Sequence, residues 1–433
     1  MKNYQNFLNI KLSLKTVFLF FVFLGFQNSN YATNKILTDT IGFEQYRGIV
    51  INSKNKKPLV YATLIVNNTN ISSITNSHGE FLLKIPTEYK NNRITVSFLG
   101  YTSKVVDFKD FDKEKIVIKL ETHIEELTEI AIEVKDPETL IREMLNRKVD
   151  NYFDFPTEMT AFYRETIKKR RTYVSLSEAV VDIKKQSYNS SRVDLLKLFK
   201  ARKNTDYNKL DTITLKLKGG PLSAIRIDVM KNTSDFFDLD TFEKYDFKFD
   251  TSTKIDNRPI YVVNFKQKPS VEESLNYGKL FIDANTFALT SIIFHVNLED
   301  KVAATRRFIV KKPRKAKVEA IEASYQINYR EKNGKWFYAY SRIQLGFKIN
   351  YDKRLFNSVY HLTMEMAITN WKKNTEGNTF KFKERLKSSV ILSDEASGFS
   401  DPEFWGDYNV IEPEKPIESA IKKIQKQLKK AKK

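Results

Sequence analysis

The sequence predicts a mainly β protein, in which a small β-sandwich is followed by a larger antiparallel β half-barrel or barrel-like domain. A linker helix is expected between them, and a basic helix at the C-terminus. Three observations lead to this fold class. Short apolar segments alternate with turn-forming residues from Tyr46 to Leu120, apolar and polar residues alternate from Phe155 to about Leu392, and the 433 residues include 32 Phe and 21 Tyr. Aromatic enrichment and period-two alternation are both typical of strands.

Residues 1–32 are predicted to be a signal peptide. Lys2, Lys11 and Lys15 precede an apolar run over residues 17–26, and Ala32 is a candidate small residue at the cleavage point. The run is shorter than the roughly 18 residues that a membrane-spanning helix needs. We therefore expect an exported protein that lies in the periplasm or is associated with the outer membrane. An uncleaved N-terminal anchor is the alternative.

The chain contains no cysteine and has a formal net charge of +20. Without cysteine an exported chain has no disulfides and no lipidated cysteine of the usual bacterial lipoprotein type, so its domains depend on core packing. An exported basic protein is expected to meet anionic lipid head groups or acidic envelope polymers, and not nucleic acid. Charge that is scattered over the surface for solubility is the alternative.

Residues 44–121 are predicted to form the sandwich. Apolar segments such as residues 46–52 (YRGIVIN) and 81–85 (FLLKI) are separated by polar, turn-forming stretches. Short strands that follow one another at intervals of about 8–12 residues are typical of a small antiparallel sandwich.

One turn in this segment resembles a metal site, because His78 and Glu80 lie on either side of Gly79. Asn76-Ser77-His78-Gly79 is a turn-forming tetrad, in which glycine readily adopts positive φ. A zinc site needs further ligands, and no second histidine lies nearby. We therefore predict a surface turn between two strands.

The same segment resembles the carboxypeptidase regulatory-like domain, a seven-stranded transthyretin-like sandwich. The residues that carry the resemblance are Gly48-Ile49-Val50, Pro58-Leu59, Ala62, Ile65-Val66, Thr75, Gly79, Phe81 and Val96-Ser97-Phe98-Leu99-Gly100-Tyr101. The resemblance implies a module that many exported envelope proteins of Bacteroidota-type bacteria carry at the N-terminus. In those proteins the module is not itself catalytic.

Residues 122–154 are predicted to be a linker that contains a strand and a helix. The strand-like ELTEIAIEV spans residues 126–134, and Asp136 is a candidate N-cap with Pro137 at the first helical position. One apolar stripe follows, made of Leu140, Ile141, Met144, Leu145 and Val149. We expect this face to pack on the next domain as a plug or lid.

Residues 155–393 are predicted to form the antiparallel β domain. Asn333-Gly334 suits a tight type I′ hairpin turn, and two further strands are expected around the turn at residues 283–286. Residues 211–218 are predicted as another strand, whereas the basic stretch at residues 191–203 is expected in a loop. Alternation also places four apolar side chains on one face: Leu362, Met364, Met366 and Ile368.

Residues 259–265 and 278–294 look like the strand pairs of lipoprotein-carrier (Lol-type) folds. This resemblance implies an open half-barrel with an apolar concave face, and we expect that face to be too extensive for the few helices to cover. An outer-membrane barrel is the competing interpretation. The Lys and Arg residues on the polar faces of the strands, and the final KKAKK, argue against it.

Residues 394–433 are predicted to be a loop and a basic helix. Ile417, Ile421, Ile424 and Leu428 fall on one helical face, and Lys422, Lys423 and Lys426 lie among them. These seven residues are candidate membrane contacts, because an apolar stripe flanked by lysines suits an anionic membrane surface. A solvated tail without a partner is the alternative.

Motifs that carry chemistry are sparse. Of the four histidines, only His123 fits a zinc-ligand spacing, in the HxxE pattern His123-Ile124-Glu125-Glu126, and a third ligand would have to be His295 or His361. Residues 218–221 (KGGP) are predicted to be a turn that lacks the helix and lysine of a phosphate-binding loop. We therefore expect no metal, no cofactor and no enzymatic activity.

These patterns favour a non-catalytic exported envelope protein whose large β domain binds an apolar or anionic component, namely a lipid or acyl chain. The expected partners are an envelope lipid or an outer-membrane protein, together with an anionic membrane surface for the C-terminal helix. The sequence does not identify the binding residues. One alternative is a protein–protein interaction scaffold at the outer membrane, and another is a zinc-dependent peptidase or other hydrolase.

Overall fold

The structure is a computed structural model of the whole chain. It describes residues 42–111, 115–122, 136–205, 220–233, 236–237, 242–255, 258–273, 275–308, 316–351, 357–387, 404–413, 417 and 419. From Phe43 onward the chain belongs to one unit. The predicted signal peptide and the predicted strands at residues 126–134 and 211–218 lie outside the described residues.

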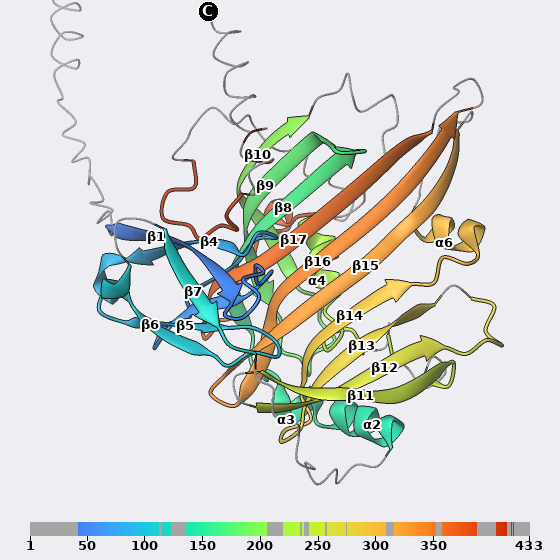
Figure 1. The fold of residues 1–433 in the computed structure, drawn as a ribbon, viewed down its shortest axis with the longest axis horizontal. Coiled ribbons are helices and arrows are strands. Elements are labelled where there is room, and N and C mark those ends of the chain that lie inside the picture. The colour runs from blue at the N-terminus through green and yellow to red at the C-terminus, as the bar shows by residue number, and fades with distance from the viewer. Residues whose placement is uncertain are drawn as a thin grey trace, which may run out of the picture. The chain divides into compact units, whose positions relative to one another are not determined.

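Seven strands form the N-terminal sandwich (Figure 1). One sheet has the order β4 (Glu80–Pro86), β1 (Phe43–Asn52), β7 (Ile116–Leu120), and the other has the order β3 (Ser72–Ile74), β2 (Thr63–Val66), β5 (Arg93–Ser97), β6 (Lys104–Asp107). Facing side chains such as Val50, Leu64 and Phe81 form one buried core. β1 and β7 pair in parallel, so the expectation of an antiparallel sandwich was wrong at this pair. The intervening strands let the chain return in the same direction, which a tight hairpin does not allow.

Ten strands form the large sheet, and every neighbouring pair is antiparallel. In sheet order they are β10 (Leu195–Thr205), β9 (Thr172–Lys185), β8 (Thr157–Lys169), β17 (Ser358–Lys373), β16 (Lys335–Tyr351), β15 (Ala316–Lys332), β14 (Leu289–Val296), β13 (Asn276–Asp283), β12 (Arg258–Gln267) and β11 (Tyr245–Ile255). β10 and β11 are the two edges, so the sheet is open and does not close into a barrel. The mainly β fold class is confirmed.

The hairpin between β15 and β16 turns at Asn333 and Gly334, whose φ angles are 53° and 79°. Positive φ at both central residues is the requirement of the predicted type I′ turn. The basic stretch at residues 191–203 is not a loop, as predicted, since most of it belongs to β10. Leu196 and Leu198 pack on the core, while Arg202 pairs with the buried Glu178 at 2.7 Å.

Helices are few in the described part of the chain. Their bounds are α2 (Pro137–Asn146), α3 (Lys148–Asn151), α4 (Pro221–Arg226) and α6 (Lys301–Phe308), with short 3₁₀ turns at Thr87–Tyr89, Phe108–Asp110 and Phe382–Glu384. The Asp136 side chain accepts a hydrogen bond from Thr139 N at 2.7 Å, as a helix N-cap does. Val149 departs from the predicted stripe: it lies in α3 and is 54% exposed, because the first helix ends at Asn146.

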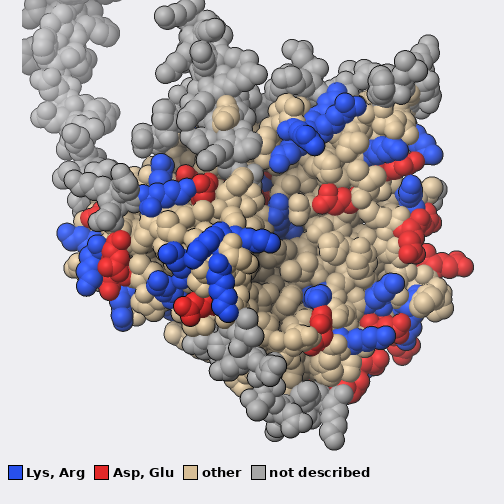
Figure 2. Space-filling model, viewed as in Figure 1, with Lys and Arg blue, Asp and Glu red and all other residues tan. Residues whose placement is uncertain are grey.

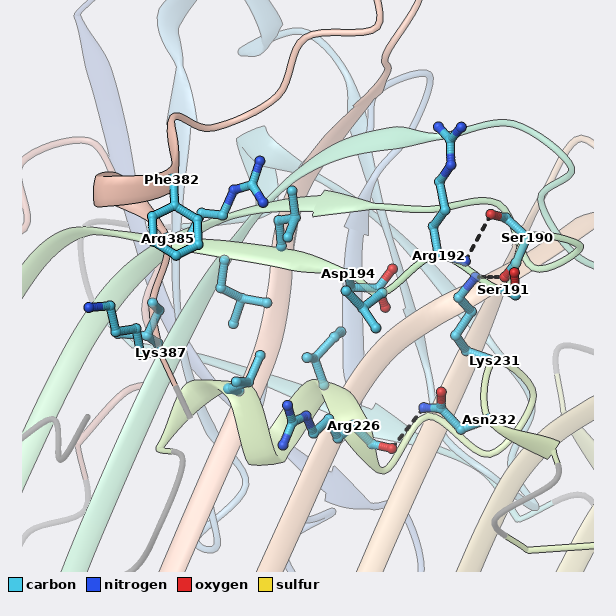
Figure 3. Close-up of a pocket in the computed structure, with 16 residues that line it drawn as sticks. Ser190, Ser191, Arg192, Asp194, Arg226, Lys231, Asn232, Phe382, Arg385 and Lys387 are labelled. Carbon is cyan, nitrogen blue, oxygen red and sulfur yellow. Dashed lines mark hydrogen bonds between the residues drawn. The ribbon is translucent and has the colours of Figure 1, made fainter. Parts of the chain in front are cut away.

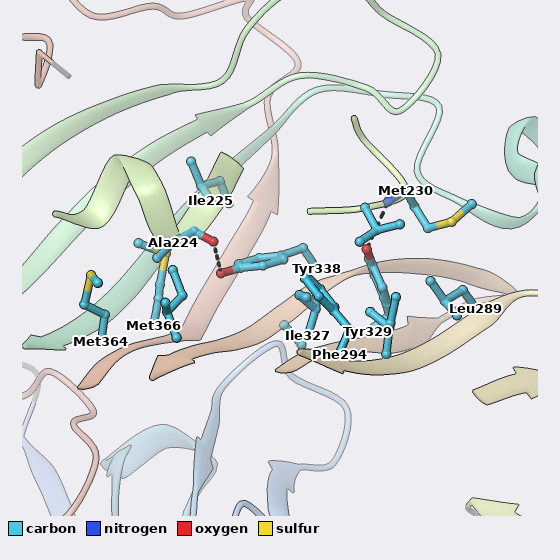
Figure 4. Packing of buried hydrophobic residues seen from close by; sticks show 14 of the residues in the cluster. Ala224, Ile225, Met230, Leu289, Phe294, Ile327, Tyr329, Tyr338, Met364 and Met366 are labelled. Atoms are coloured by element: carbon cyan, nitrogen blue, oxygen red, sulfur yellow. Dashed lines mark hydrogen bonds between the residues drawn. The ribbon is translucent and has the colours of Figure 1, made fainter. Parts of the chain in front are cut away.

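The inner face of the large sheet, defined here as the face that contacts α4, is buried. Met364 and Met366 lie in one apolar core with Ala224 and Ile225 of α4 (Figure 4). Tyr338 Oη donates a hydrogen bond to Ala224 O at 2.9 Å. We had expected the helices to leave this face open, and that expectation was wrong for the described residues, because α2, α4 and residues 227–237 pack over it.

The opposite, outer face contacts the sandwich. Phe162, Val180, Tyr340 and Ala367 of the sheet share one buried cluster with Tyr61, Ile74 and Leu82 of the sandwich and with Trp405, Val410 and Ile411 of the C-terminal segment. Ser72 Oγ donates to Ile368 O at 3.0 Å. Figure 2 views the molecule from this side, where charged side chains lie mostly around the margin of the exposed sheet.

Candidate functional site

A pocket of about 560 Å³ lies at the β10 edge of the large sheet (Figure 3). Its walls come from α4, from the start of β10 with the residues before it, and from residues 231–232 and 382–387. Leu386 N donates to Leu196 O at 2.7 Å, which fixes the last of these segments beside the edge strand.

The pocket is strongly basic. Five cationic side chains line it, against one carboxylate, Asp194: they are Arg192, Arg226, Lys231, Arg385 and Lys387. Within the described part of the chain, none of the five forms an ion pair with a carboxylate. Arg385 Nε donates to Phe380 O at 3.1 Å and Lys231 Nζ donates to Ser187 O at 2.7 Å, so both are positioned by neutral carbonyls.

The single carboxylate is already neutralised from below. Asp194 Oδ2 accepts from the buried Lys185 Nζ at 2.7 Å, and its Oδ1 accepts from Gln186 N at 2.8 Å. Lys185 Nζ also lies 2.8 Å from Asp228 Oδ2. Burial opposes the charge on Lys185, but the charges of Asp194 and Asp228 outweigh it and raise the pKa of the ammonium.

Asp228 connects the pocket to the core. It is fully buried and accepts hydrogen bonds from Tyr188 Oη at 3.0 Å, Tyr329 Oη at 2.8 Å and Lys231 N at 3.2 Å. These contacts hold the turn after α4, and therefore the backbone of Lys231, against the inner face. Burial lowers the pKa of the Lys231 ammonium to about 8, so this cation changes charge near neutral pH.

The rest of the lining is apolar. Leu195, Leu196, Leu222, Ile225 and Leu386 contribute to the walls. Two large apolar side chains at the pocket are mostly in solvent, since Val193 is 74% exposed and Phe382 is 77% exposed. A cavity of this size that combines apolar walls with unpaired cations suits a ligand with an apolar body and an anionic group.

The candidate membrane contacts of the C-terminal tail are mostly outside the described residues. Ile421, Ile424, Leu428, Lys422, Lys423 and Lys426 all belong to that group and stay a prediction. Ile417 is described, and it is 3% exposed and packs against Leu176. In this structure its side chain therefore contacts protein.

The predicted turn at His78 is confirmed. Gly79 has a φ of 71° and its N–H donates to Asn76 O at 2.9 Å, while Asn76 Oδ1 accepts from His78 N and Glu80 N. His361 and His295 both lie on the outer face, where His361 Nδ1 is 3.1 Å from Glu322 Oε2 and His295 stacks on Tyr277.

His123 lies outside the described residues, so its zinc-ligand pattern is not addressed. Among the residues that are described, no group of three or more His, Asp or Glu side chains is placed to hold a metal ion. The turn at residues 218–221 is followed by a helix, α4, which we had not predicted. Pro221 occupies its first turn, a position that suits proline because the missing N–H would have no partner there.

Sequence reasoning missed the basic pocket. Its cations come from residues 192, 226, 231, 385 and 387, and each segment by itself has an ordinary density of Lys and Arg. The only signal was the basic stretch at residues 191–203, which we had assigned to a loop. Pairing of β10 with β9 and packing of α4 bring these segments together, and neither was predicted.

Comparisons with known proteins concern mainly the sandwich. The family model described as "CarboxypepD_reg-like domain" matches residues 46–132. No curated protein matches the chain. In the described part of the chain, no helix combines the length and apolarity needed to cross a bilayer.

Two solved structures are similar to the chain at low identity. A DUF1329 family protein from Desulfovibrio piger has 11% identity and a TM-score of 0.25, covering 57% of this chain and 98% of that one. A LolA superfamily protein from Nitrosomonas europaea has 9% identity and a TM-score of 0.20, covering 59% and 99%. These TM-scores are too low to establish a shared fold. The family match, in contrast, confirms that residues 46–132 resemble the carboxypeptidase regulatory-like domain.

Proposed function

We propose that the protein is a non-catalytic, exported binding protein of the cell envelope, and that the pocket between α4 and β10 binds an anionic amphiphile. The acyl chain lies along the apolar walls, and the acidic head group lies among the cations. The single observation that carries the proposal is the set of five cations without a carboxylate partner above apolar walls.

Electrostatics favours such a ligand. Five cations that share one pocket repel one another, and an anionic head group relieves that repulsion through charge-assisted hydrogen bonds. The neighbouring acid does not compete, since Asp194 is held by Lys185. Val193 and Phe382, which are mostly in solvent, gain apolar contact when an acyl chain is present.

The wider context supports a role in the envelope. The predicted signal peptide over residues 1–32 implies export, and the resemblance to a regulatory-like module implies that the N-terminal part is not itself catalytic. The proposal keeps the predicted division of the chain at residues 44–121, 122–154, 155–393 and 394–433. It also keeps the tail beyond Ile417 as a contact for an anionic membrane or an outer-membrane protein.

The direct test is binding of cis-parinaric acid, a fluorescent fatty acid, to the full-length mature protein after removal of bound lipid. We expect saturable binding in the wild type. The double variant Arg226→Gln/Arg385→Gln should bind at least about tenfold more weakly, because charge-assisted hydrogen bonds of about 1.5–3 kcal/mol are lost. The matched control Lys104→Gln/Lys119→Gln removes two exposed cations from the sandwich and should bind like the wild type.

Two outcomes would contradict the proposal. One is an absence of saturable binding together with an absence of lipid in organic extracts of the native protein, which would favour the interaction scaffold. The other is an equal loss of affinity in both double variants, which would mean that net charge matters and this pocket does not. Stoichiometric zinc in the purified protein would instead favour the hydrolase.

A further inference from the structure

A second pocket, of about 460 Å³, lies between the sandwich and the outer face of the large sheet. It is far from α4 in the sheet order, since its lower wall comes from β12, β14, β15 and β16. The residues that matter here are Ile65 and Leu99 of the sandwich, with Ile293, Asn328, Arg330 and Trp336 of the sheet.

Trp336 places an unpaired donor in this pocket. The residue is only 5% exposed, and its indole Nε1 is buried without a hydrogen-bond partner. A buried donor left without a partner costs about 1–3 kcal/mol, so such groups are rare in folded proteins. Trp336 is otherwise held firmly, because its carbonyl accepts from Phe153 N at 3.2 Å.

Arg330 adds a positive charge that no described carboxylate balances. Its Nε is buried without a partner, and its Nη2 makes only a long contact of 3.4 Å to Ile368 O. The guanidinium lies 5.2 Å from the ring of Phe337. Burial lowers its pKa to about 10, so it is still protonated at neutral pH. A buried charge of this kind is normally paired.

The acceptors beside these donors are already used. Glu331 Oε2 accepts from Arg258 Nη2 at 2.8 Å, and its Oε1 accepts from Gly334 N in the hairpin turn. Asn328 Oδ1 accepts from Ser291 Oγ at 2.8 Å. The pocket therefore offers unsatisfied donors and needs a ligand that accepts.

We propose that this pocket binds a small apolar monocarboxylate. One carboxylate oxygen accepts from Arg330 Nε and the other from Trp336 Nε1, while the apolar body lies against Ile65, Leu99 and Ile293. Two donors match the two oxygens of a carboxylate, and the carboxylate of Glu331 in the same lining disfavours a ligand with more negative charge. The proposal does not rest on lipid binding at the pocket between α4 and β10.

The test uses the intact protein with ¹⁵N-labelled tryptophan indoles and 4-phenylbutyrate as the probe. The chain has three tryptophans, Trp336, Trp371 and Trp405, so three indole N–H signals are expected. The Trp336 signal should shift saturably, with the other two nearly unchanged. 4-Phenylbutyramide, which has the same shape without the charge, should bind at least about tenfold more weakly.

Variants assign the site. Arg330→Gln should weaken 4-phenylbutyrate at least about tenfold, whereas Arg192→Gln, which alters only the other pocket, should leave its affinity unchanged. If Arg330→Gln does not fold, Trp336→Phe keeps the ring but removes the donor. In that case calorimetric titration should show several-fold weaker binding.

Three results would overturn the proposal. They are a Trp336 signal that does not move at up to about 10 mM probe, which covers affinities into the millimolar range, equal affinities for the acid and its amide, and loss of binding in Arg192→Gln. None of them affects the cis-parinaric acid experiment, so the two proposals fail separately.

Discussion

Lys185 shows how a single residue determines the chemistry of the basic pocket. Its ammonium is 2.7 Å from Asp194 and 2.8 Å from Asp228, and all three side chains are almost fully buried. The two carboxylates hold Lys185, and Lys185 in turn prevents Asp194 from neutralising the cations that line the pocket. The same residue therefore supports both the core and the charge of the site.

Replacement of Lys185 by methionine should destabilise the protein strongly. Lys185→Met leaves Asp194 and Asp228 buried without their cation, and removal of one partner from a buried ion network costs about 3–5 kcal/mol. Urea unfolding of the full-length protein measures this loss. The control is Lys197→Met, whose ion pair with Glu384 is about one-third exposed, and it should change the free energy of unfolding by less than about 1 kcal/mol.

Lys231 should make anion binding depend on pH. Its pKa of about 8 in the free protein rises when an anion binds, so binding takes up a proton above that pH. Affinity for cis-parinaric acid should be constant below pH 8 and fall as pH rises from 8 to 10, by at most about tenfold per pH unit. Titrations at constant ionic strength measure this. In Lys231→Arg the decline should disappear, and an unchanged slope would show that another group titrates.

At the scale of elements, local sequence predicted most turns and strands. The Asn333-Gly334 hairpin, the Asp136 cap of α2 and the alternation at residues 362–368 all depend on neighbours in the chain. β10 was missed because its lysines and arginines concealed the alternation, and their charges are accommodated by partners such as Glu178 that come from other strands. α4 was missed because it is only six residues long and is stabilised by the sheet beneath it.

Gly278 shows a constraint that one element imposes on another. A Cβ added there would lie 2.1 Å from Ile293 O and 2.6 Å from Phe294 Cα, which are backbone atoms of β14. Gly278→Ala should therefore destabilise the protein by about 1–3 kcal/mol, because the strands have to move apart. The urea midpoint measures this change. Lys279→Ala, in the same strand but half-exposed, should have little effect, and equal midpoints in the two variants would contradict the argument.

At the scale of the whole molecule, the C-terminal segment helps to hold the sandwich on the large sheet. Trp405 packs edge-on against Phe162 at 5.4 Å, and the guanidinium of Arg202 lies 4.9 Å from its ring. Asn409 Oδ1 accepts from Lys84 N at 2.7 Å, and Asn409 Nδ2 donates to Lys84 O at 2.8 Å. The segment thus contacts both the sheet and an exposed backbone edge of β4.

Trp405→Ala should loosen this attachment. Removal of a buried tryptophan costs about 3–5 kcal/mol, and the segment should dissociate before the sheets unfold. Hydrogen exchange followed by mass spectrometry should then show faster exchange in the peptide that contains Lys84, while peptides from β15 and β16 stay protected. Phe382→Ala, at a side chain that is 77% exposed, serves as the control. Equal exchange in the wild type and Trp405→Ala would contradict the role of the segment.

The sequence alone determined the mainly β class, the sandwich and its resemblance, and the turns at His78 and Asn333, because alternation and turn chemistry act between residues close in the chain. Only the tertiary structure decided that the sheet stays open, that its inner face is covered, and where the two pockets lie. Their lining residues come from distant segments, and strand pairing sets those distances. For the same reason the orphaned donors of Arg330 and Trp336 are invisible in the sequence: whether a polar group has a partner depends on what folds against it.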